Sequence, residues 1–349
     1  MRAWSCVVAM ATVASQACQS PTNPTEASPA ADFHRGRPGA PARPLGVYGS
    51  DGEGRRGCRG PDDRAFDFWV GSWTVTNARG LPPEVSEITR GPGRCMIFEK
   101  YNGGRGRSIS RFDRVAGRWV QDYVDNTGLT LRLDGTRTGD VMHLTDTVRA
   151  IPNGPALASQ FDWTANPDGT VHQLWLLSLD GGASFLKNAD LVYHPTTDVL
   201  PPEPPAPTVC AERPAYRALD ALVGRWRVRD SRGRRIGVTT VELTAGQCLL
   251  EERFVGDDGY RLTAFTYLDR FVGRWYRAQA DSYGNTFRLG GAFDGSVLPL
   301  AGPAPGRQGG VVPVRMTWQL ADGPVQRWEA QGSDGNWGDV ATFHWEPIR

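Results

Sequence analysis

The sequence has few lysines, a balanced charge and no long apolar run. Only two of its 39 basic residues are lysines. The 38 acidic residues nearly balance the 39 basic ones, which gives a net charge of +1. This balance excludes the extended basic surface of a nucleic-acid-binding protein. No stretch reaches the ~18 consecutive apolar residues of a transmembrane helix. We therefore expect no nucleic-acid partner, and membrane attachment only through a lipid anchor.

The sequence also lacks the motifs of common enzyme classes. It has no Gly-x-Ser-x-Gly motif, phosphate-binding loop or Rossmann fingerprint. Its five histidines do not recur in the internal repeat described below, and close Cys-x-x-Cys pairs for a metal are missing. We expect no metal and no cofactor. An enzymatic role is disfavoured, and only a carboxylate mechanism through Glu99 or Glu252 stays open.

The first residues have the character of an export signal. Arg2 precedes the short apolar run 7–14, and small residues form a cleavage context before Cys18. We predict a signal peptide over residues 1–17 and a disordered, Pro-, Ala- and Gly-rich tether over 18–57. Cys18 is the candidate for lipidation. A lipoprotein of the cell envelope and a soluble periplasmic or secreted protein both remain open.

An internal repeat occupies most of the remaining chain. Val70–Val75 recurs as Val223–Val228, 153 residues later, and the same displacement carries Glu99 onto Glu252. The second copy then has three extra residues, and with the displacement increased by three Arg132 matches Arg288. The chain therefore contains two copies of one module.

The copies set the predicted domain boundaries. The first module covers residues 58–196, a proline-rich linker covers 197–209, and the second module covers 210–349. A module of this size suits an independently folded domain.

Each module is predicted to form about ten short strands. Apolar and β-branched runs alternate with turn signals such as Asn126-Thr127-Gly128. Hairpin-length connections favour antiparallel neighbours, and so long a meander must close or split into two layers to protect its edges. The predicted fold class is all-β, with two tandem antiparallel, up-and-down β-barrels.

The opening segment of the first module carries a family resemblance. Phe66–Trp73 reads FDFWVGSW and resembles the first strand of calycin-type barrels, the lipocalin and fatty-acid-binding superfamily. It is more similar still to secreted bacterial proteins of unknown function that open with Phe-Asp-Phe-Trp-x-Gly-x-Trp. The resemblance covers both modules and implies lipocalin-like barrels, with Trp73 and Trp226 as structural residues closing one end of the core. Nitrobindin-like haem barrels are also similar, but Thr74-Val75 and Arg227-Val228 replace their glycines, so no haem is expected.

Four cysteines repeat with the modules. Cys58 lies 37 residues before Cys95, and Cys210 lies 38 before Cys248. Only pairing within each copy preserves the repeat, and export brings the chain to an oxidising compartment. We predict two structural disulfides, Cys58–Cys95 and Cys210–Cys248.

The repeated charged residues are the candidate ligand-binding residues. Strand alternation places Glu99 and Glu252 on the more apolar face of their strands, facing inward. A buried carboxylate needs a partner, and the repeated Arg132 and Arg288 are natural candidates. These pairs either bind the polar head of a ligand in each lumen or serve as structural ion pairs.

Three functions remain in view. A binding module for a small apolar or amphipathic molecule is favoured, because barrels of this size hold one ligand and tryptophan-rich walls suit apolar guests. The alternatives are an envelope interaction or scaffold protein with filled barrels, and a carboxylate-dependent hydrolase. The oligomeric state stays open.

Overall fold

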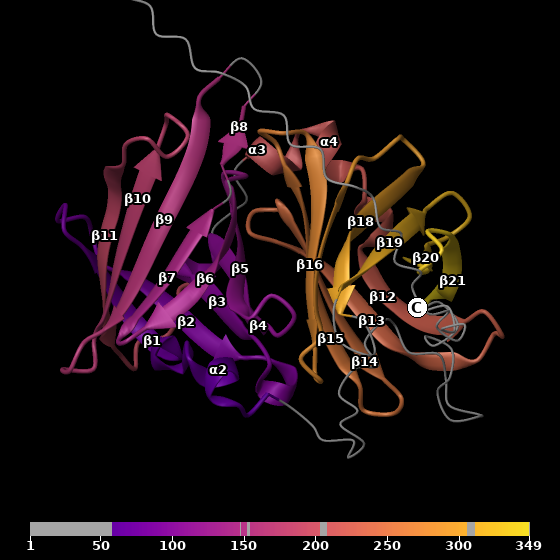
Figure 1. Cartoon of the computed structure of the whole chain (residues 1–349), viewed down its shortest axis with the longest axis horizontal. Helices are drawn as coiled ribbons and strands as arrows, with labels where there is room; N and C mark the ends of the chain where they lie inside the picture. The colour runs from indigo at the N-terminus through magenta and orange to yellow at the C-terminus, as the bar shows by residue number, and fades with distance from the viewer. Residues whose placement is uncertain (1–57, 147, 152–153, 203–207, 306–310, 349) are drawn as a thin grey trace, which may run out of the picture.

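The chain folds into two antiparallel β-barrels, which lie beside each other in Figure 1. This computed structural model describes residues 58–146, 148–151, 154–202, 208–305 and 311–348. The all-β prediction with two tandem ten-stranded barrels is confirmed. The predicted signal peptide and tether, with Cys18, lie outside the described residues.

The first barrel contains β1 to β7 and β9 to β11, and the two-residue strand β8 pairs only with β9. Sequence neighbours pair with each other, while β7 pairs with β9 and β11 returns to β1 to close the barrel. The strands are β1 (Gly71–Asn77), β2 (Glu84–Arg90), β3 (Ile97–Tyr101), β4 (Gly106–Asp113), β5 (Arg118–Asp125), β6 (Thr130–Thr138), β7 (Val141–Asp146), β8 (Arg149–Ala150), β9 (Ala156–Ala165), β10 (Val171–Ser178) and β11 (Leu186–Pro195).

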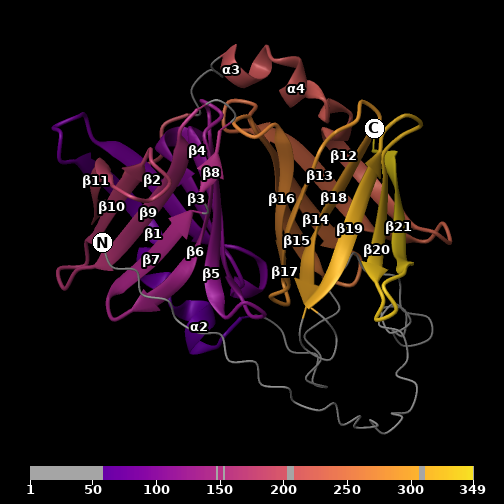
Figure 2. The same ribbon diagram turned by 45° about the horizontal axis from the view of Figure 1, so that its top comes forward.

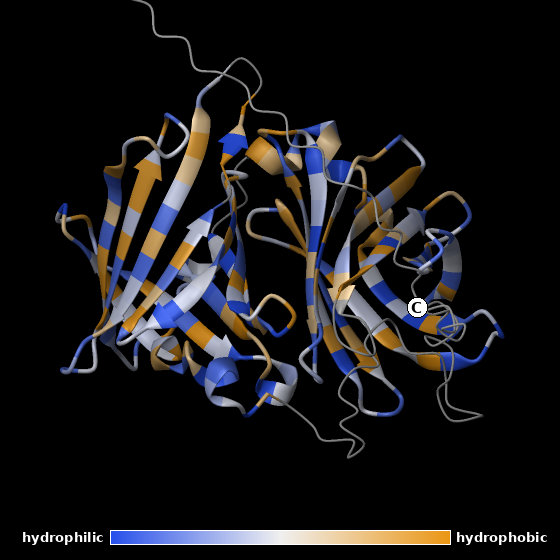
Figure 3. Cartoon of the chain, in the orientation of Figure 1, coloured by the Kyte–Doolittle hydropathy of each residue, from blue (hydrophilic) through white to orange (hydrophobic). Residues whose placement is uncertain are grey.

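The second barrel repeats this arrangement in ten consecutive strands, and β21 pairs with β12 to close it. The strands are β12 (Gly224–Asp230), β13 (Arg235–Thr244), β14 (Leu249–Gly256), β15 (Arg261–Asp269), β16 (Arg274–Asp281), β17 (Thr286–Gly291), β18 (Val297–Pro305), β19 (Val311–Gln319), β20 (Val325–Gln331) and β21 (Trp337–Pro347). Figure 3 shows apolar and polar residues alternating along the strands of both barrels, as expected when one face points into a core.

Short helical turns precede the first strand of each barrel, and two more, η2 and η3, precede β3 and β4 of the first barrel. In Figure 2, α3 and α4 lie at the end of the barrels where the chain enters its second copy. The turns are α2 (Pro61–Arg64), η1 (Asp67–Trp69), η2 (Pro92–Arg94), η3 (Asn102–Gly104), α3 (Thr208–Ala211), α4 (Pro214–Arg217) and η4 (Asp220–Leu222). Trp73 Nε1 donates to the Trp69 carbonyl at 2.9 Å, and Trp226 Nε1 donates to the Leu222 carbonyl at the same distance. Each tryptophan thus joins its first strand to the preceding turn.

Both predicted disulfides, Cys58–Cys95 and Cys210–Cys248, are confirmed. Each links the segment before the first barrel strand to the turn before the third. Two disulfides are compatible with an exported protein.

The barrels pack through equivalent strands, with β3 to β6 of the first facing β14 to β17 of the second. Phe98 stacks on Phe265, with ring centroids 6.2 Å apart. Charged contacts cross as well, at 3.6 Å between Arg107 Nη1 and Glu251 Oε2.

The disulfides contribute to the same interface in a reciprocal way. A β-carbon placed on Gly284 of the second barrel would lie 2.7 Å from Cys58 Sγ of the first. One placed on Gly128 of the first barrel would lie 3.4 Å from Cys210 Sγ of the second. Each disulfide therefore packs on the equivalent glycine turn of the other barrel. Such an exchange of equivalent contacts is typical of a two-fold interface.

Candidate functional site

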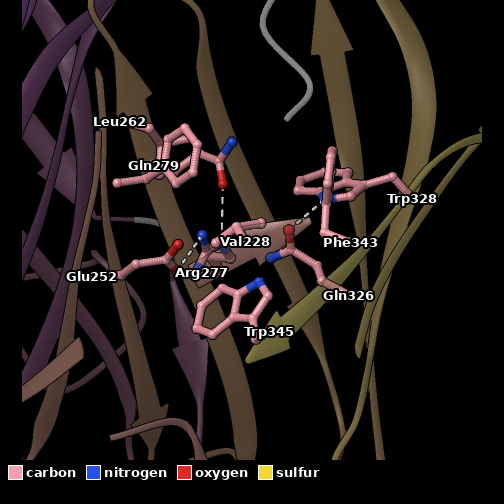
Figure 4. A pocket seen from close by; sticks show the side chains of 10 residues that line it. Val228, Glu252, Leu262, Arg277, Gln279, Gln326, Trp328, Phe343 and Trp345 are labelled. Carbon is pink, nitrogen blue, oxygen red and sulfur yellow. Dashed lines mark hydrogen bonds and ion pairs between the residues drawn. The ribbon is translucent and has the colours of Figure 1, made fainter. Parts of the chain in front are cut away.

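The lumen of the second barrel contains a buried polar network (Figure 4). Arg277 Nη2 lies 2.8 Å from Glu252 Oε2, and both side chains are buried. Arg277 Nε donates to Gln279 Oε1 at 3.0 Å, and Nη1 donates to Thr266 Oγ1 at 3.2 Å. Thr239 Oγ1 donates to the other Glu252 oxygen at 3.2 Å. The buried carboxylate is thus neutralised and hydrogen-bonded by the barrel itself.

Aromatic side chains fill most of the space around this network. Trp328 Nε1 donates to Gln326 Oε1 at 3.0 Å, and Trp318 packs edge-on against Trp345 at 4.6 Å between ring centroids. The cavity beside Glu252 has a volume of about 10 Å³. This is room for about one water molecule.

The first barrel keeps the carboxyl group but not its cation. Glu99 is 7% exposed and accepts a hydrogen bond from Ser108 Oγ at 3.0 Å. The repeat position of Arg277 is occupied by Gln121, whose Nε2 donates to Ser110 Oγ at 2.9 Å. No ion pair to Glu99 occurs within the described ranges. Burial raises the pKa of Glu99 to about 7, although the Ser108 hydrogen bond acts in the opposite direction.

Other buried polar groups share this lumen. Burial, and then nearby acidic groups that include Glu99, raise the pKa values of Tyr123 and Tyr193 well above the ordinary range. Tyr193 donates to Gln173 Oε1 at 2.6 Å. Ser86 Oγ and Trp175 Nε1 are buried without a hydrogen-bond partner in the described part of the chain. Their counterparts in the second barrel, Thr239 and Trp328, both have partners.

A second acidic group, Glu84 of β2, also lies on the inner face of the first barrel. Glu84 accepts hydrogen bonds from Tyr101 and Asn102. Burial raises its pKa, and the nearby Arg105 opposes that shift. Glu84 and Glu99 both act on Tyr123 and Tyr193, so the two carboxyl groups border one region of the lumen.

Glu99 and Glu252 lie inside their barrels, as strand alternation predicts, but the expected partners were wrong. Arg132 and Arg288 point away from the lumens, because the apolar residues flanking them on β6 and β17 face inward. Arg288 Nε instead reaches Asp122 Oδ2 of the other barrel at 2.9 Å. The Arg132 guanidinium stacks 3.9 Å from the ring centroid of Tyr276, also across the interface.

The partner that sequence reasoning missed is Arg277. It stands two residues after Trp275 on β16, and the same alternation that orients Glu252 would have placed both inward. Applied to Leu131 and Leu133 of β6, the rule would also have placed Arg132 outward. Among the residues that the structure describes, no three His, Cys, Asp or Glu side chains lie together so that they could hold a metal ion.

Comparison with known proteins gives a distant structural likeness. No protein-family model and no curated protein matches the chain. The chain is similar to a protein of unknown function of the DUF3598 family from Nostoc punctiforme, with 11% identity over 83% of this chain and 100% of that one, at a TM-score of 0.20. The likeness to calycin barrels stays a prediction. No helix among the described residues is long and apolar enough to cross a membrane.

Proposed function

We propose that this protein is an exported binding protein that holds a small amphipathic amine in the lumen of its first barrel. The observation that carries the proposal is the difference between the two copies at one position. Where Arg277 neutralises Glu252, Gln121 leaves Glu99 without a cation. A bound ammonium group supplies the missing positive charge and favours the ionised carboxylate.

Inward-facing residues of the first barrel suit the two ends of such a ligand. Glu84 adds a second acidic group on the same inner face. Phe161 stacks between Trp163 and Trp175, with ring centroids 5.3 and 5.0 Å away. Aromatic faces bind both apolar groups and cations. The ligand is therefore a small amine with an apolar or aromatic portion.

In this proposal the second barrel has a structural role and binds no amine in its lumen. Its lumen has room for about one water molecule, and its carboxylate is already neutralised by Arg277. One alternative function considered from the sequence was a scaffold protein with filled barrels. In this proposal, that description fits the second barrel.

The proposal predicts that 2-phenylethylamine binds more tightly than its uncharged analogue 2-phenylethanol. We expect Glu99→Gln to weaken amine binding by at least about 30-fold, equal to about 2 kcal/mol, because a buried charged contact is lost. The alcohol should be affected little. Isothermal titration calorimetry on the full mature chain measures both affinities.

Two further variants make the test specific to the first lumen. Gln121→Arg copies the arrangement of the second barrel and should remove amine binding in a protein that still melts cooperatively. Arg225→Gln, on an exposed position of β12, is the control and should bind as the parent does. Equal affinity for the amine and the alcohol, or full binding by the Gln121→Arg variant, would contradict the proposal.

The proposal that the protein is exported leads to a separate prediction about its N-terminus. We expect the mature protein in the envelope or the medium, without its first 17 residues and with Cys58, Cys95, Cys210 and Cys248 all held in disulfides. If Cys18 is lipidated, Cys18→Ser should move the protein from the membrane fraction to the soluble one. Fractionation and intact-mass measurement distinguish the two routes, and a cytoplasmic protein that retains Met1 would refute export.

A further inference from the structure

A larger cavity lies between the two barrels, separate from the site proposed in the first lumen. Its volume is about 320 Å³. The first barrel contributes Asp122 of β5 and Arg132 of β6, and the second contributes parts of β16, β17 and β18. One wall lies where β17 and β18 are paired only through Gly290 and Ala301.

The wall of this cavity is strongly cationic. Arg132, Arg274 and Arg288 line it, and Asp122 is the one acidic residue among the described lining residues. Asp122 is already fully engaged: Oδ2 lies 2.9 Å from Arg288 Nε and 2.8 Å from Arg111 Nη1, and Oδ1 accepts from Tyr267 at 2.7 Å. One carboxylate is therefore shared by two guanidinium groups.

Arg132 and Arg274 have no such partner. Neither forms an ion pair with any residue that the structure describes. Arg132 stacks on Tyr276, but its Nε is buried and donates to no acceptor in the described ranges. Arg274 is exposed at the start of β16. Both guanidinium groups keep donors free for a ligand.

The repeat explains why Arg132 has no carboxylate. Asp122 of β5 stands opposite Arg132 on β6, and at the equivalent place Ala278 of β16 stands opposite Arg288 on β17. In a symmetric interface, the pairing of Asp122 with Arg288 would be mirrored by residue 278 with Arg132. Because residue 278 is alanine, the cavity has one carboxylate where symmetry calls for two.

Neighbouring acidic groups offset this excess only in part: Asp146 lies close enough to act on Arg132 and Arg288, but its ion pair is with Arg149. Asp134 lies 2.9 Å from Arg118 and 4.0 Å from Arg288. Arg149 contacts both Asp146 and Asp269, at 3.1 and 3.4 Å. A further lining arginine, Arg277, is neutralised by Glu252 in the second lumen.

We propose that this cavity binds a small molecule through a phosphate or carboxylate group held by Arg132, Arg274 and Arg288. Guanidinium groups match the geometry of both oxyanions and bind them through paired hydrogen bonds. The volume exceeds that of a single oxyanion and leaves room for a metabolite-sized body. The ligand contacts both barrels.

The test uses inorganic phosphate and citrate as probes, at constant ionic strength in chloride. We expect saturable binding of at least one probe to the full mature chain by isothermal titration calorimetry, and the preferred probe identifies the oxyanion. Arg274→Gln should weaken that binding by at least 10-fold, and Arg132→Gln likewise. Arg225→Gln, which removes an exposed arginine on β12 away from the cavity, should bind as the parent does.

Arg274 is exposed, so its replacement leaves the packing between the barrels intact and keeps the test valid if Arg132→Gln loosens the fold. Failure of both probes to bind saturably would overturn the proposal. Equal affinity in the parent and in Arg274→Gln would overturn it too. Binding of 2-phenylethylamine is measured separately, so failure at either site does not imply failure at the other.

Discussion

Replacing Glu99 by glutamine should stabilise the ligand-free protein at pH 8, whereas the matched Glu252→Gln should destabilise it. At pH 8 the native fold holds Glu99 ionised in a buried site without a cation, and glutamine removes that cost. The pKa rises from 4.5 to about 7, which corresponds to about 3 kcal/mol of unfolding free energy. Glu252→Gln instead leaves the Arg277 guanidinium buried and uncompensated, at a cost of about 3 to 5 kcal/mol.

The Glu99 effect has a defined pH dependence. Below pH 4.5, Glu99 is protonated in both the folded and the unfolded chain, so glutamine should change stability little. Between pH 4.5 and about 7 the unfolded chain releases its proton first, and the parent loses stability as the pH rises. Urea unfolding of the parent and Glu99→Gln at pH 4, 6 and 8 measures this divergence. A difference that does not change with pH would contradict the assignment.

Replacing Asp122 by asparagine should cost about 3 to 5 kcal/mol of unfolding free energy, because it leaves two arginines without their shared counter-charge. Arg111 is fully buried between the barrels. Burial alone would raise the pKa of Asp122, but the Arg288 and Arg111 guanidinium groups outweigh it and lower the pKa to about 2. The contribution of Asp122 is therefore complete above about pH 4, and it is lost as the pH falls towards 2.

Asp134→Asn is the matched control for this substitution. Asp134 pairs with the half-exposed Arg118 and lies only at the limit of an ion pair, 4.0 Å, from Arg288, and an exposed ion pair contributes at most about 1 kcal/mol. Urea unfolding at pH 7 compares the two variants. A similar small effect for both would show that Asp122 does not hold the barrels together.

The repeat in the sequence was sufficient for the architecture. Because Cys58 and Cys210 keep the same spacing to Cys95 and Cys248, the disulfides could be paired before any fold was known. Alternation likewise oriented Glu99 correctly. These features depend on local periodicity or on the comparison of two copies.

The partners of the charged residues could not be predicted in the same way. Alternation indicates which face of a strand a residue occupies, but not whether a neighbouring domain covers that face. Arg132 and Arg288 both point outward from their own barrels. The second barrel covers Arg132, and the first barrel covers Arg288. The apolar outward residues Ile109 and Val124 are fully buried in the interface, and they were the available signal that the faces meet.

The reciprocal packing of each disulfide on the other barrel's glycine turn gives the covalent connection a thermodynamic role. Two separate modules with this interface would associate only as their concentration allowed, whereas modules on one chain meet at a high effective concentration. The two barrels on one chain therefore stay assembled even when the free energy of their association is less favourable than two separate modules would need to form a dimer. This tolerance is compatible with the difference between the copies at residues 122 and 278, which leaves Arg132 without a carboxylate.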